Sequence, residues 1–521
     1  MKKLLSLILC VIILLGAFSV TSFADSKALT YKEKIINAIH NMETEVDLRE
    51  YKIKYTGADE ILVYLQYLFN QYPEYYYWNI GGVTVNPQTY EWNTLKLAYS
   101  MTKEQMLIER MFMENETNKV INKIGKDWSE TEKALYVHDW LDVNYMYDYV
   151  LFEHPGEENH DIVGFLKDKR GVCQSYAYTY MYILRRMGIN SYYVCSDTDN
   201  HGWNVVQIDG KWYHVDATYD DPILGDTYHH DYVGEVRHDK FLLSDSQILE
   251  DGDHDDFYIP FVDGIVCNEY KGNSSWRTAT TAVHKIGEYW YYLDNSKEDG
   301  GLMRTKDFKD TETLMKIGHY VEDWGICGWK RDDGIIQNNY YAGLFEYNGH
   351  LFFNTEKDIY VYDSHHDEFN KVPIDRPEGK YYYGLNMEGK TIDYLISPNN
   401  IFNAEIVEGK YTLGEQIHHY PTDWEIIKQP TKTEEGEQIK FCYYCADIVE
   451  RQTIPALGGQ FTGVLGDADG NGETNTVDLA ILKLFLAGTR KEIGNAVDFN
   501  SDGIVDTVDL ASLKLKLAGL L

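Results

Sequence analysis

The sequence is short of basic residues and of cysteine, and each shortage excludes a class of protein. Its 521 residues include 48 Lys and Arg against 83 Asp and Glu, which gives a net charge of −35. A chain this acidic has no large surface that neutralises phosphates, so we expect no nucleic-acid partner and no binding to anionic membranes. The 7 cysteines are too few for a disulfide framework in a chain of this size, so we expect at least one thiol to serve chemistry instead.

Apolar runs long enough to span a membrane are also missing. Lys2 and Lys3 precede an apolar run over residues 4–18, and a polar stretch follows that ends at Ala24. This order is typical of a cleaved secretory signal, and the run is shorter than the roughly 20 residues of a spanning helix. We therefore expect residues 1–24 to be a signal peptide, with an uncleaved anchor as the alternative. We then expect the mature chain to be secreted, extracellular or at the cell surface, and to have no membrane span.

Apolar and aromatic residues, by contrast, are plentiful, at 44% and 14%. They suffice to bury several cores, and the length predicts about three to five folded units. We expect a multidomain α+β protein. Its parts are a helical N-terminal region (25–128), a mixed domain that opens with the capping box Ser129–Glu132 (129–260), a β-rich sandwich or propeller-like domain (273–410), a small Cys-x-x-Cys module with a linker (411–460) and a C-terminal repeat (463–521).

The Cys-x-x-Cys module contains Cys442 and Cys445. Thiolates suit Zn²⁺, and His418 and His419 are candidate partners for the same ion. Because only two cysteines are present and no histidine follows them, we favour a local disulfide or free thiols over a zinc site.

The C-terminal repeat is a tandem duplication. Residues 467–488 and 498–519 align without gaps and share Thr-Val-Asp-Leu-Ala, Leu-Lys-Leu and Leu-Ala-Gly. Each copy begins with acidic or amide side chains at alternate positions and has a Gly at the sixth, which permits a sharp turn. This spacing of oxygen atoms predicts two Ca²⁺ sites, in which Glu473 and Ile504 supply backbone carbonyls. The predicted ligands are Asp467, Asp469, Asn471, Glu473, Asn475 and Asp478 in the first loop and Asp498, Asn500, Asp502, Ile504, Asp506 and Asp509 in the second.

Two features separate these loops from a standard EF-hand. The twelfth residue is Asp rather than Glu, and each loop is followed by a helix but not preceded by one. The module resembles a type I dockerin, a small all-α calcium-binding fold, over 463–521. The resemblance implies docking to a cohesin domain on a scaffoldin, as in cellulosomes. The contact positions of that family fall on Thr476, Val477, Lys483 and Leu484 in the first copy and on Thr507, Val508, Lys514 and Leu515 in the second.

Cys173 is the thiol with the clearest chemical setting. An apolar stripe at helical spacing follows it and ends near Gly188, so the pattern places Cys173 in the first turn of a helix. A helix N-terminus lowers the pKa of a thiol and offers free backbone N–H groups to a developing oxyanion. The alternative is a buried structural cysteine. We expect that role for Cys195, Cys267 and Cys327, either buried or paired with one another.

A hairpin downstream supplies a base. Asp209 and Gly210 lie between two alternating runs, which is a strong hairpin signal. If they are the two loop residues, His201 and Asp216 are diagonal neighbours on one face, within side-chain reach. A general base oriented by a carboxylate follows from this register. His214 shares the same face, so the register alone does not choose between the two imidazoles.

A family resemblance makes that choice. Gly-Val-Cys with Tyr-Ala, His-x-Trp-Asn and Trp-Tyr-His-Val-Asp-x-Thr, in this order and spacing, resemble the transglutaminase-like fold, a papain-like core, over about 129–260. The resemblance implies that Cys173, His201 and Asp216 are the catalytic residues. Tyr219 stands where relatives usually place Trp, a departure that we expect to affect packing more than chemistry.

These features predict a secreted, cellulosome-associated thiol enzyme that attacks amide carbonyls. We favour peptide or amide hydrolysis over Gln–Lys cross-linking, because no second substrate site is visible in the sequence. The expected partners are a scaffoldin cohesin, a protein or peptide substrate and cell-wall polysaccharide. The expected cofactors are two Ca²⁺ ions, without an organic cofactor. One alternative is a non-catalytic adhesion or structural protein that binds wall polysaccharide or protein. The other is a glycoside hydrolase, which is suggested only because dockerin modules commonly occur in such enzymes.

Overall fold

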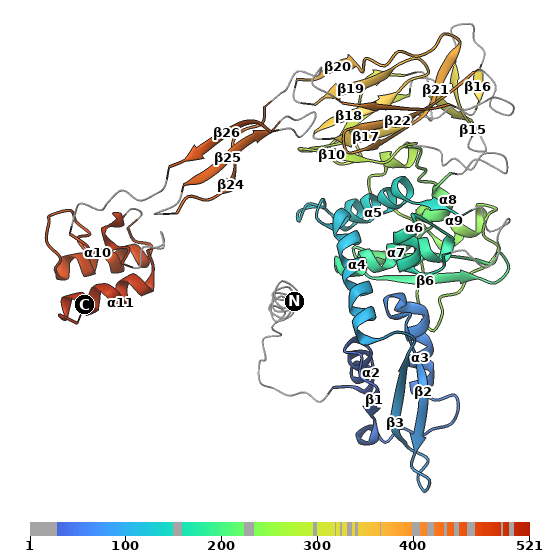
Figure 1. Ribbon diagram of the computed structural model, residues 1–521. Helices are drawn as coiled ribbons and strands as arrows, with labels where there is room; N and C mark the ends of the chain where they lie inside the picture. The colour runs from blue at the N-terminus through green and yellow to red at the C-terminus, as the bar shows by residue number, and fades with distance from the viewer. Residues whose placement is uncertain are drawn as a thin grey trace. The chain divides into compact units, whose positions relative to one another are not determined.

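A computed structural model shows helices and antiparallel sheets along the whole chain (Figure 1). Contacts divide the chain into two compact units, Met1–Tyr219 with Lys240–Lys271, and Asp220–Asp239 with Gly272–Leu521. No described helix is long and apolar enough to cross a membrane. The structure describes residues 29–148, 159–222, 234–294, 300–317, 319–322, 326–330, 336–338, 342–347, 349–364, 366–398, 407–413, 421–431, 435–441, 448–455, 464–490, 493–499 and 505–520. The expected signal peptide, 1–24, lies outside these residues.

The N-terminal part of the first unit differs from the helical region that the sequence predicts for 25–128. Its helices are α2 (Tyr31–His40), α3 (Glu60–Gln71) and α4 (Lys103–Ile121). Between them lies a three-stranded antiparallel sheet of β1 (Glu45–Asp47), β2 (Trp78–Val85) and β3 (Trp92–Tyr99), in the order β1-β3-β2. Leu95 and Leu97 are buried and alternate with exposed Lys96 and Ala98, which is a strand period and not a helical one.

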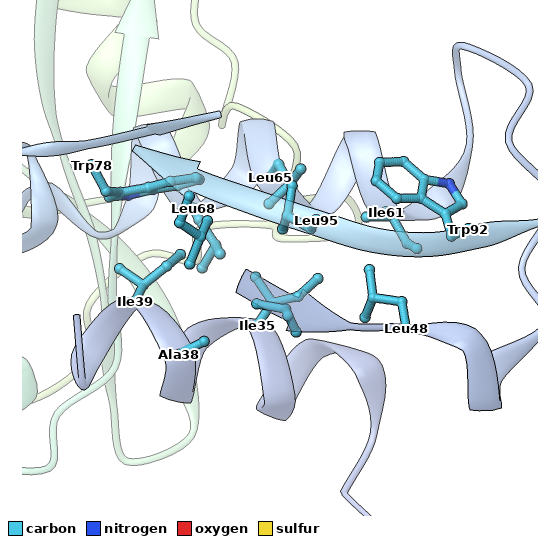
Figure 2. Packing of buried hydrophobic residues seen from close by; sticks show 12 residues of the cluster. Ile35, Ala38, Ile39, Leu48, Ile61, Leu65, Leu68, Trp78, Trp92 and Leu95 are labelled. Carbon is cyan, nitrogen blue, oxygen red and sulfur yellow. The ribbon is translucent and has the colours of Figure 1, made fainter. Parts of the chain in front are cut away.

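Apolar side chains from α2, α3 and this sheet form one core (Figure 2). Ile35 of α2 and Leu65 of α3 are fully buried, as are Trp92 and Leu95 of β3. The indole of Trp92 also donates a hydrogen bond to Asp59, 3.2 Å away, at the N-cap of α3. The sheet and the two helices are therefore held together by apolar burial and by one buried polar contact.

The rest of the first unit brings the candidate residues together. The predicted capping box of Ser129 and Glu132 is present and begins α5 (Glu130–Asn144). The remaining helices are α6 (Ile162–Asp168), α7 (Cys173–Arg186), α8 (Ala217–Asp220) and α9 (Asp245–Glu250). The strands are a parallel pair, β4 (Met146–Tyr147) with β5 (Arg170–Gly171), and an antiparallel sheet of β6 (Ser191–Ser196), β7 (His201–Ile208), β8 (Lys211–Val215) and β9 (Phe241–Leu243) in chain order.

Both faces of the sheet β6–β9 are covered. On one face Asn204 donates a hydrogen bond to the carbonyl of Ala177 in α7, at 3.0 Å. On the other face Trp203 and Val205 pack with Ile248 of α9 and with Cys267. The strands therefore lie in a buried layer, and the polar groups on them must find partners inside the protein.

Between residues 284 and 412, the described part of the second unit forms four antiparallel sheets, each a meander of consecutive strands. Apolar residues from the first, third and fourth sheets, among them Leu293, Leu351 and Leu395, form a shared core. The sheets are β10 (His284–Ile286), β11 (Tyr289–Asp294), β12 (Gly301–Thr305) and β13 (Thr311–Lys316); β14 (His319–Glu322), β15 (Ile326–Lys330) and β16 (Ile336–Asn338); β17 (Leu344–Tyr347), β18 (His350–Asn354), β19 (Ile359–Asp363) and β20 (Glu368–Lys371); and β21 (Lys380–Glu388), β22 (Thr391–Pro398) and β23 (Val407–Thr412).

Two smaller parts follow along the chain. One is a three-stranded antiparallel sheet of β24 (Glu425–Lys428), β25 (Gly436–Phe441) and β26 (Ile448–Ile454). The candidate zinc residues His418, His419, Cys442 and Cys445 lie outside the described residues, so their pairing stays a prediction. The other part contains α10 (Thr476–Leu486) and α11 (Thr507–Leu517), whose fully buried Leu482 and Leu513 share a core.

Leu65→Ala is expected to destabilise the N-terminal core. The side chain is fully buried, and its truncation costs about 2–5 kcal/mol because the cavity only partly collapses. Hydrogen exchange of peptides from residues 31–99, followed by mass spectrometry on the full chain, measures the loss of protection. The control is Val63→Ala on the same helix, where the side chain is 45% exposed and the change is within about 0.5 kcal/mol. Equal protection in the two variants would contradict this description of the core.

Candidate functional site

The hairpin of β7 and β8 has the register that the sequence predicts. Asn204 pairs with Val215 and Ile208 pairs with Lys211, so Asp209 and Gly210 form the two-residue loop. Both loop residues have positive φ, 49° and 77°, as a type I′ turn requires. The ladder stops at Val215 because α8 begins at Ala217, so the extended pairing of His201 with Thr218 is not formed.

His201 and Asp216 nevertheless meet. His201 is the first residue of β7, and its Nε2 lies 2.6 Å from Oδ2 of Asp216, the residue between β8 and α8. The backbone N–H groups of Thr218 and Tyr219 donate to Oδ1 of Asp216 at 3.0 and 3.3 Å. The start of α8 thus fixes the carboxylate, and the carboxylate orients the imidazole.

Cys173 is the first residue of α7, as predicted. Its N-cap, Val172, offers no capping side chain, and the carbonyl of Val172 accepts from the N–H groups of Ser175 and Tyr176. Within the described part of the chain, the N–H groups of Cys173 and Gln174 donate to no protein acceptor. The half-buried thiol lies next to His201 and helps to raise the pKa of that imidazole. Because Nε2 of His201 faces Asp216, Nδ1 is the nitrogen left for the thiol.

The charges in this triad support one another. Burial lowers the pKa of His201, but Asp216 and the Cys173 sulfur outweigh burial and raise it well above the ordinary value. Burial likewise raises the pKa of Asp216, and its hydrogen bonds to His201 and His254 reverse the effect, so that the pKa is held below its usual range. The imidazole is therefore a cation and the carboxylate an anion at neutral pH.

His214, the other imidazole of the hairpin, has different partners. Its Nδ1 accepts a hydrogen bond from the indole of Trp203 at 3.0 Å, and its Nε2 lies 3.0 Å from Asp245. Burial lowers the pKa of His214, as expected for a ring that must keep one nitrogen unprotonated. The structure thus brings His201, and not His214, to Asp216.

The other described cysteines lack the setting of Cys173. Cys195 and Cys267 are free thiols, so of the two predicted alternatives, burial or pairing with one another, pairing of these two does not occur. Cys267 is buried and Cys195 is partly buried, and the side chain of Cys327 lies outside the described residues. Burial raises the pKa of Cys195 to about 11, and burial together with Asp245 raises that of Cys267 further.

Cys267, His214 and Asp245 also form a cluster of potential metal ligands. A metal on Nε2 of His214 would compete with the proton that this nitrogen shares with Asp245, while Nδ1 is already occupied as an acceptor. The donor set therefore fits a hydrogen-bond network better than a metal ion.

Two residues near the triad, His254 and Lys240, were not predicted from the sequence. His254 lies 3.0 Å from Oδ2 of Asp216 through its Nε2, and its Nδ1 lies 2.9 Å from Asp251. Lys240 forms ion pairs with Asp251 and Asp253 at 2.9 and 2.7 Å. Tyr219, the departure noted in the sequence, packs edge-on against His201 with ring centroids 4.9 Å apart. No local motif or periodicity marks His254, because it comes 38 residues after Asp216 in the chain.

The first loop of the C-terminal repeat gathers three of its predicted calcium ligands. Oxygen atoms of Asp467, Asp469 and Asp478 lie within 4.8 Å of one another. Gly472 at the sixth position has φ +89°, a conformation that side chains rarely adopt. Asp478 is fully buried and accepts hydrogen bonds from the N–H groups of Ala468 and Asn475. Clustered carboxylates on a loop closed in this way fit Ca²⁺. The remaining predicted ligands of this loop, Asn471, Glu473 and Asn475, belong to the same described turn.

The second loop repeats these contacts where it is described. Asp509 is fully buried and accepts from the N–H groups of Phe499 and Asp506, at 2.7 and 2.9 Å. Asp498 is also buried. The predicted ligands Asn500, Asp502 and Ile504 lie outside the described residues.

The eight predicted cohesin contacts all lie on exposed positions of α10 and α11. The two copies match closely, since Val477 and Val508 are each 52% exposed and Leu484 and Leu515 are 48% and 43% exposed. The remaining exposed members are Thr476, Lys483, Thr507 and Lys514. The role of these two faces as cohesin contacts stays a prediction.

Comparisons with known proteins give two matches to family models. Residues 118–217 match the transglutaminase-like superfamily, and residues 465–518 match the dockerin type I domain. No curated protein matches the chain.

Two solved structures show only distant similarity. The crystal structure of a TGase is 13% identical with a TM-score of 0.21, over 32% of this chain and 50% of the other. The crystal structure of the tricorn protease is 14% identical with a TM-score of 0.13, over 36% of this chain and 18% of the other. These scores are too low to establish a shared fold. The family matches alone show that the chain carries a transglutaminase-like domain followed, at its C-terminal end, by a type I dockerin domain.

Proposed function

We propose that Cys173, His201 and Asp216 form the catalytic triad of a thiol acyl-transfer enzyme. The observation that carries the proposal is the 2.6 Å hydrogen bond between His201 and Asp216, with the Cys173 thiol at the start of α7 next to the same imidazole. His201 carries the proton, so Cys173 reacts as the thiolate of a thiolate–imidazolium pair and attacks an amide carbonyl. His201 then returns the proton to the leaving amine, and an incoming water or amine takes the acyl group from sulfur.

The start of α7 supports the same chemistry. The oxyanion of the tetrahedral intermediate forms beside Cys173, where the N–H groups of Cys173 and Gln174 have no protein acceptor among the described residues. The positive end of the helix dipole points to this place, so the developing negative charge is stabilised without rearrangement. We favour hydrolysis of peptides or amides over cross-linking, since no second substrate site is evident.

The dockerin is proposed to attach this enzyme to a cohesin domain on an extracellular scaffoldin. Its two loops would each hold one Ca²⁺, and the matching exposed faces of α10 and α11 would give two alternative docking surfaces. Secretion through the predicted signal peptide and a polysaccharide-degrading assembly are part of this proposal. We also propose that the four meanders of the second unit are propeller-like blades, since consecutive antiparallel strands are the order found in blades.

Cys173 is expected to be the thiol that reacts fastest with iodoacetamide at about pH 6. A cationic His201 stabilises its thiolate there, whereas Cys195, with a pKa raised to about 11, stays protonated and Cys267 is buried. Peptide mass spectrometry of the labelled full chain measures the rate at each cysteine. Cys173→Ala should abolish the fast labelling. Labelling of Cys195 or Cys267 at a comparable rate would undo the assignment.

Asp216→Asn is expected to preserve the fold and to lower the rate on the order of 10⁴-fold, the loss known for the orienting aspartate of serine proteases. The rate is measured with casein and a peptide library, with and without a fluorescent primary amine, so that cleavage and amine incorporation are counted separately. The matched control is His214→Ala, which removes the other imidazole of the hairpin, one that forms no hydrogen bond with Asp216. A larger loss in His214→Ala would show that the wrong imidazole has been assigned. No turnover in any arm would favour a non-catalytic binding protein.

Cohesin binding is expected to survive the loss of either docking face. Replacing Thr476 and Val477 with Ala weakens binding little because Thr507 and Val508 can substitute, and replacing all four removes it. Calorimetry with a type I cohesin measures the affinity. Chelation of Ca²⁺ should also abolish binding and reduce the helical circular dichroism of residues 464–520, since repulsion among the loop carboxylates is then unrelieved. Retention of helicity and affinity in EDTA would refute the dockerin assignment, whereas the reactivity of Cys173 should not change.

A further inference from the structure

His254 is held between two carboxylates inside the transglutaminase-like unit. Its Nε2 lies 3.0 Å from Oδ2 of Asp216, and its Nδ1 lies 2.9 Å from Oδ2 of Asp251. The side chain of His254 is completely buried. The backbone N–H of His254 also donates to Asp251, at 3.2 Å, so the ring and the main chain are fixed by the same residue.

This geometry determines the protons on the ring. A carboxylate oxygen accepts hydrogen bonds and an ionised one has no proton to donate. With an ionised carboxylate at each nitrogen, His254 satisfies both contacts only when both nitrogens carry a proton, and such a ring is a cation. A neutral ring would place a lone pair against an anionic oxygen in a site without water access, which is a costly arrangement.

Lys240 completes a sequence of alternating charges. Its ammonium group is nearly buried and pairs with Asp251 and Asp253 at 2.9 and 2.7 Å. Starting from the lysine, the groups are Lys240, Asp251, His254, Asp216, His201 and Cys173, and each contacts the next. Basic and acidic side chains alternate along this series up to His201, and the series ends on the sulfur atom of Cys173.

We propose that His254 is a positioning residue that acts on Cys173 as a buried imidazolium, sharing Oδ2 of Asp216 with His201 and setting the pH range in which the Cys173–His201 pair is charged. The inference rests on the proposed thiol site. His254 lies far from Cys173 along the chain, so no sequence motif connects the two residues.

The groups around His254 come from every neighbouring element. The ring of Trp203 packs edge-on against the ring of His254, with centroids 4.7 Å apart. The ring centroids of His254 and His201 lie 5.6 Å apart. Lys240 and Asp253 stand behind Asp251. The titratable groups that face or act on His254 are Asp216 after β8, Asp251 at the end of α9, His201 on β7, His214 on β8, Tyr219 on α8 and Asp199 in the β6–β7 turn.

A positive charge on His254 has one expected effect on the triad. It favours the deprotonated form of each neighbouring group, so removing it shifts every neighbouring titration to higher pH. The rate of alkylation of Cys173 rises with pH as the thiolate–imidazolium pair forms and changes again as His201 loses its proton. Both midpoints should therefore move upward together, by about one to two pH units for charges at this separation.

The test is the pH profile of iodoacetamide labelling at Cys173 in the full chain, compared with His254→Gln. Glutamine retains a donor for Asp216 but carries no charge, so both midpoints should rise while the protein stays folded. His254→Lys restores the charge and should return the midpoints toward those of the unaltered protein. His350→Gln is the matched control, because His350 is a buried histidine beside a carboxylate in the second unit and should change neither midpoint.

Asp251→Asn provides a second arm if His254→Gln does not fold, since with one carboxylate removed His254 needs only one proton and both midpoints should again rise. Unmoved midpoints in the folded variants, or a loss of amplitude alone, would refute the role of His254 and leave the triad intact. If Cys173 of the unaltered protein shows no fast labelling at low pH, the proposed function itself fails, and this outcome is separate from the first.

Discussion

The hydrogen bond between His201 and Asp216 is the contact on which the thiol site depends. It joins the first residue of β7 to the residue that follows β8, so it exists only if the hairpin has one register. A shift of one residue would turn every side chain of the strand to the other face. The two-residue turn at Asp209 and Gly210 prevents this shift, because only a turn with two positive φ angles fits between the strands. The chemistry at Cys173 is thus set by a turn at the far end of the hairpin.

The parts of the site that local rules determine were predictable, and those that depend on tertiary contacts were not. The helix start at Cys173 and the register of the hairpin follow from short-range patterns, and the structure has both. The choice of His201 over His214 needed a family resemblance, because the deciding contact, Trp203 with His214, joins two buried side chains. His254 was missed because the chain between Asp216 and His254 carries no periodic signal. For Cys195 and Cys267 the sequence left burial and pairing open, and the structure has two free thiols, one buried and one partly buried.

The same distinction applies to the fold. The C-terminal module was predictable because the sequence repeats itself. Leu482 and Leu513 occupy the same position in the two copies, and they share a core because the two helices pack together. The N-terminal region was harder. Its strands lie between helices, and the clear alternation in β3 is confined to a few residues such as Leu95 and Leu97. The burial of Trp92 and Leu95 against α2 and α3 covers one face of the sheet (Figure 2), a tertiary contact that no local pattern shows.

Acidic residues outnumber basic ones in this chain, and its two candidate sites neutralise the negative charge of their carboxylates in different ways. In the dockerin loops, Asp467, Asp469 and Asp478 converge without a basic side chain among them, so an external cation must neutralise them. In the transglutaminase-like unit, buried Asp216 and partly buried Asp251 lie beside His201, His254 and Lys240, which are basic side chains of the protein itself. A resident cation costs desolvation on folding but stays in place at any ion concentration. We therefore expect the loops to respond to the calcium concentration around the protein, and the proposed thiol site to respond to pH.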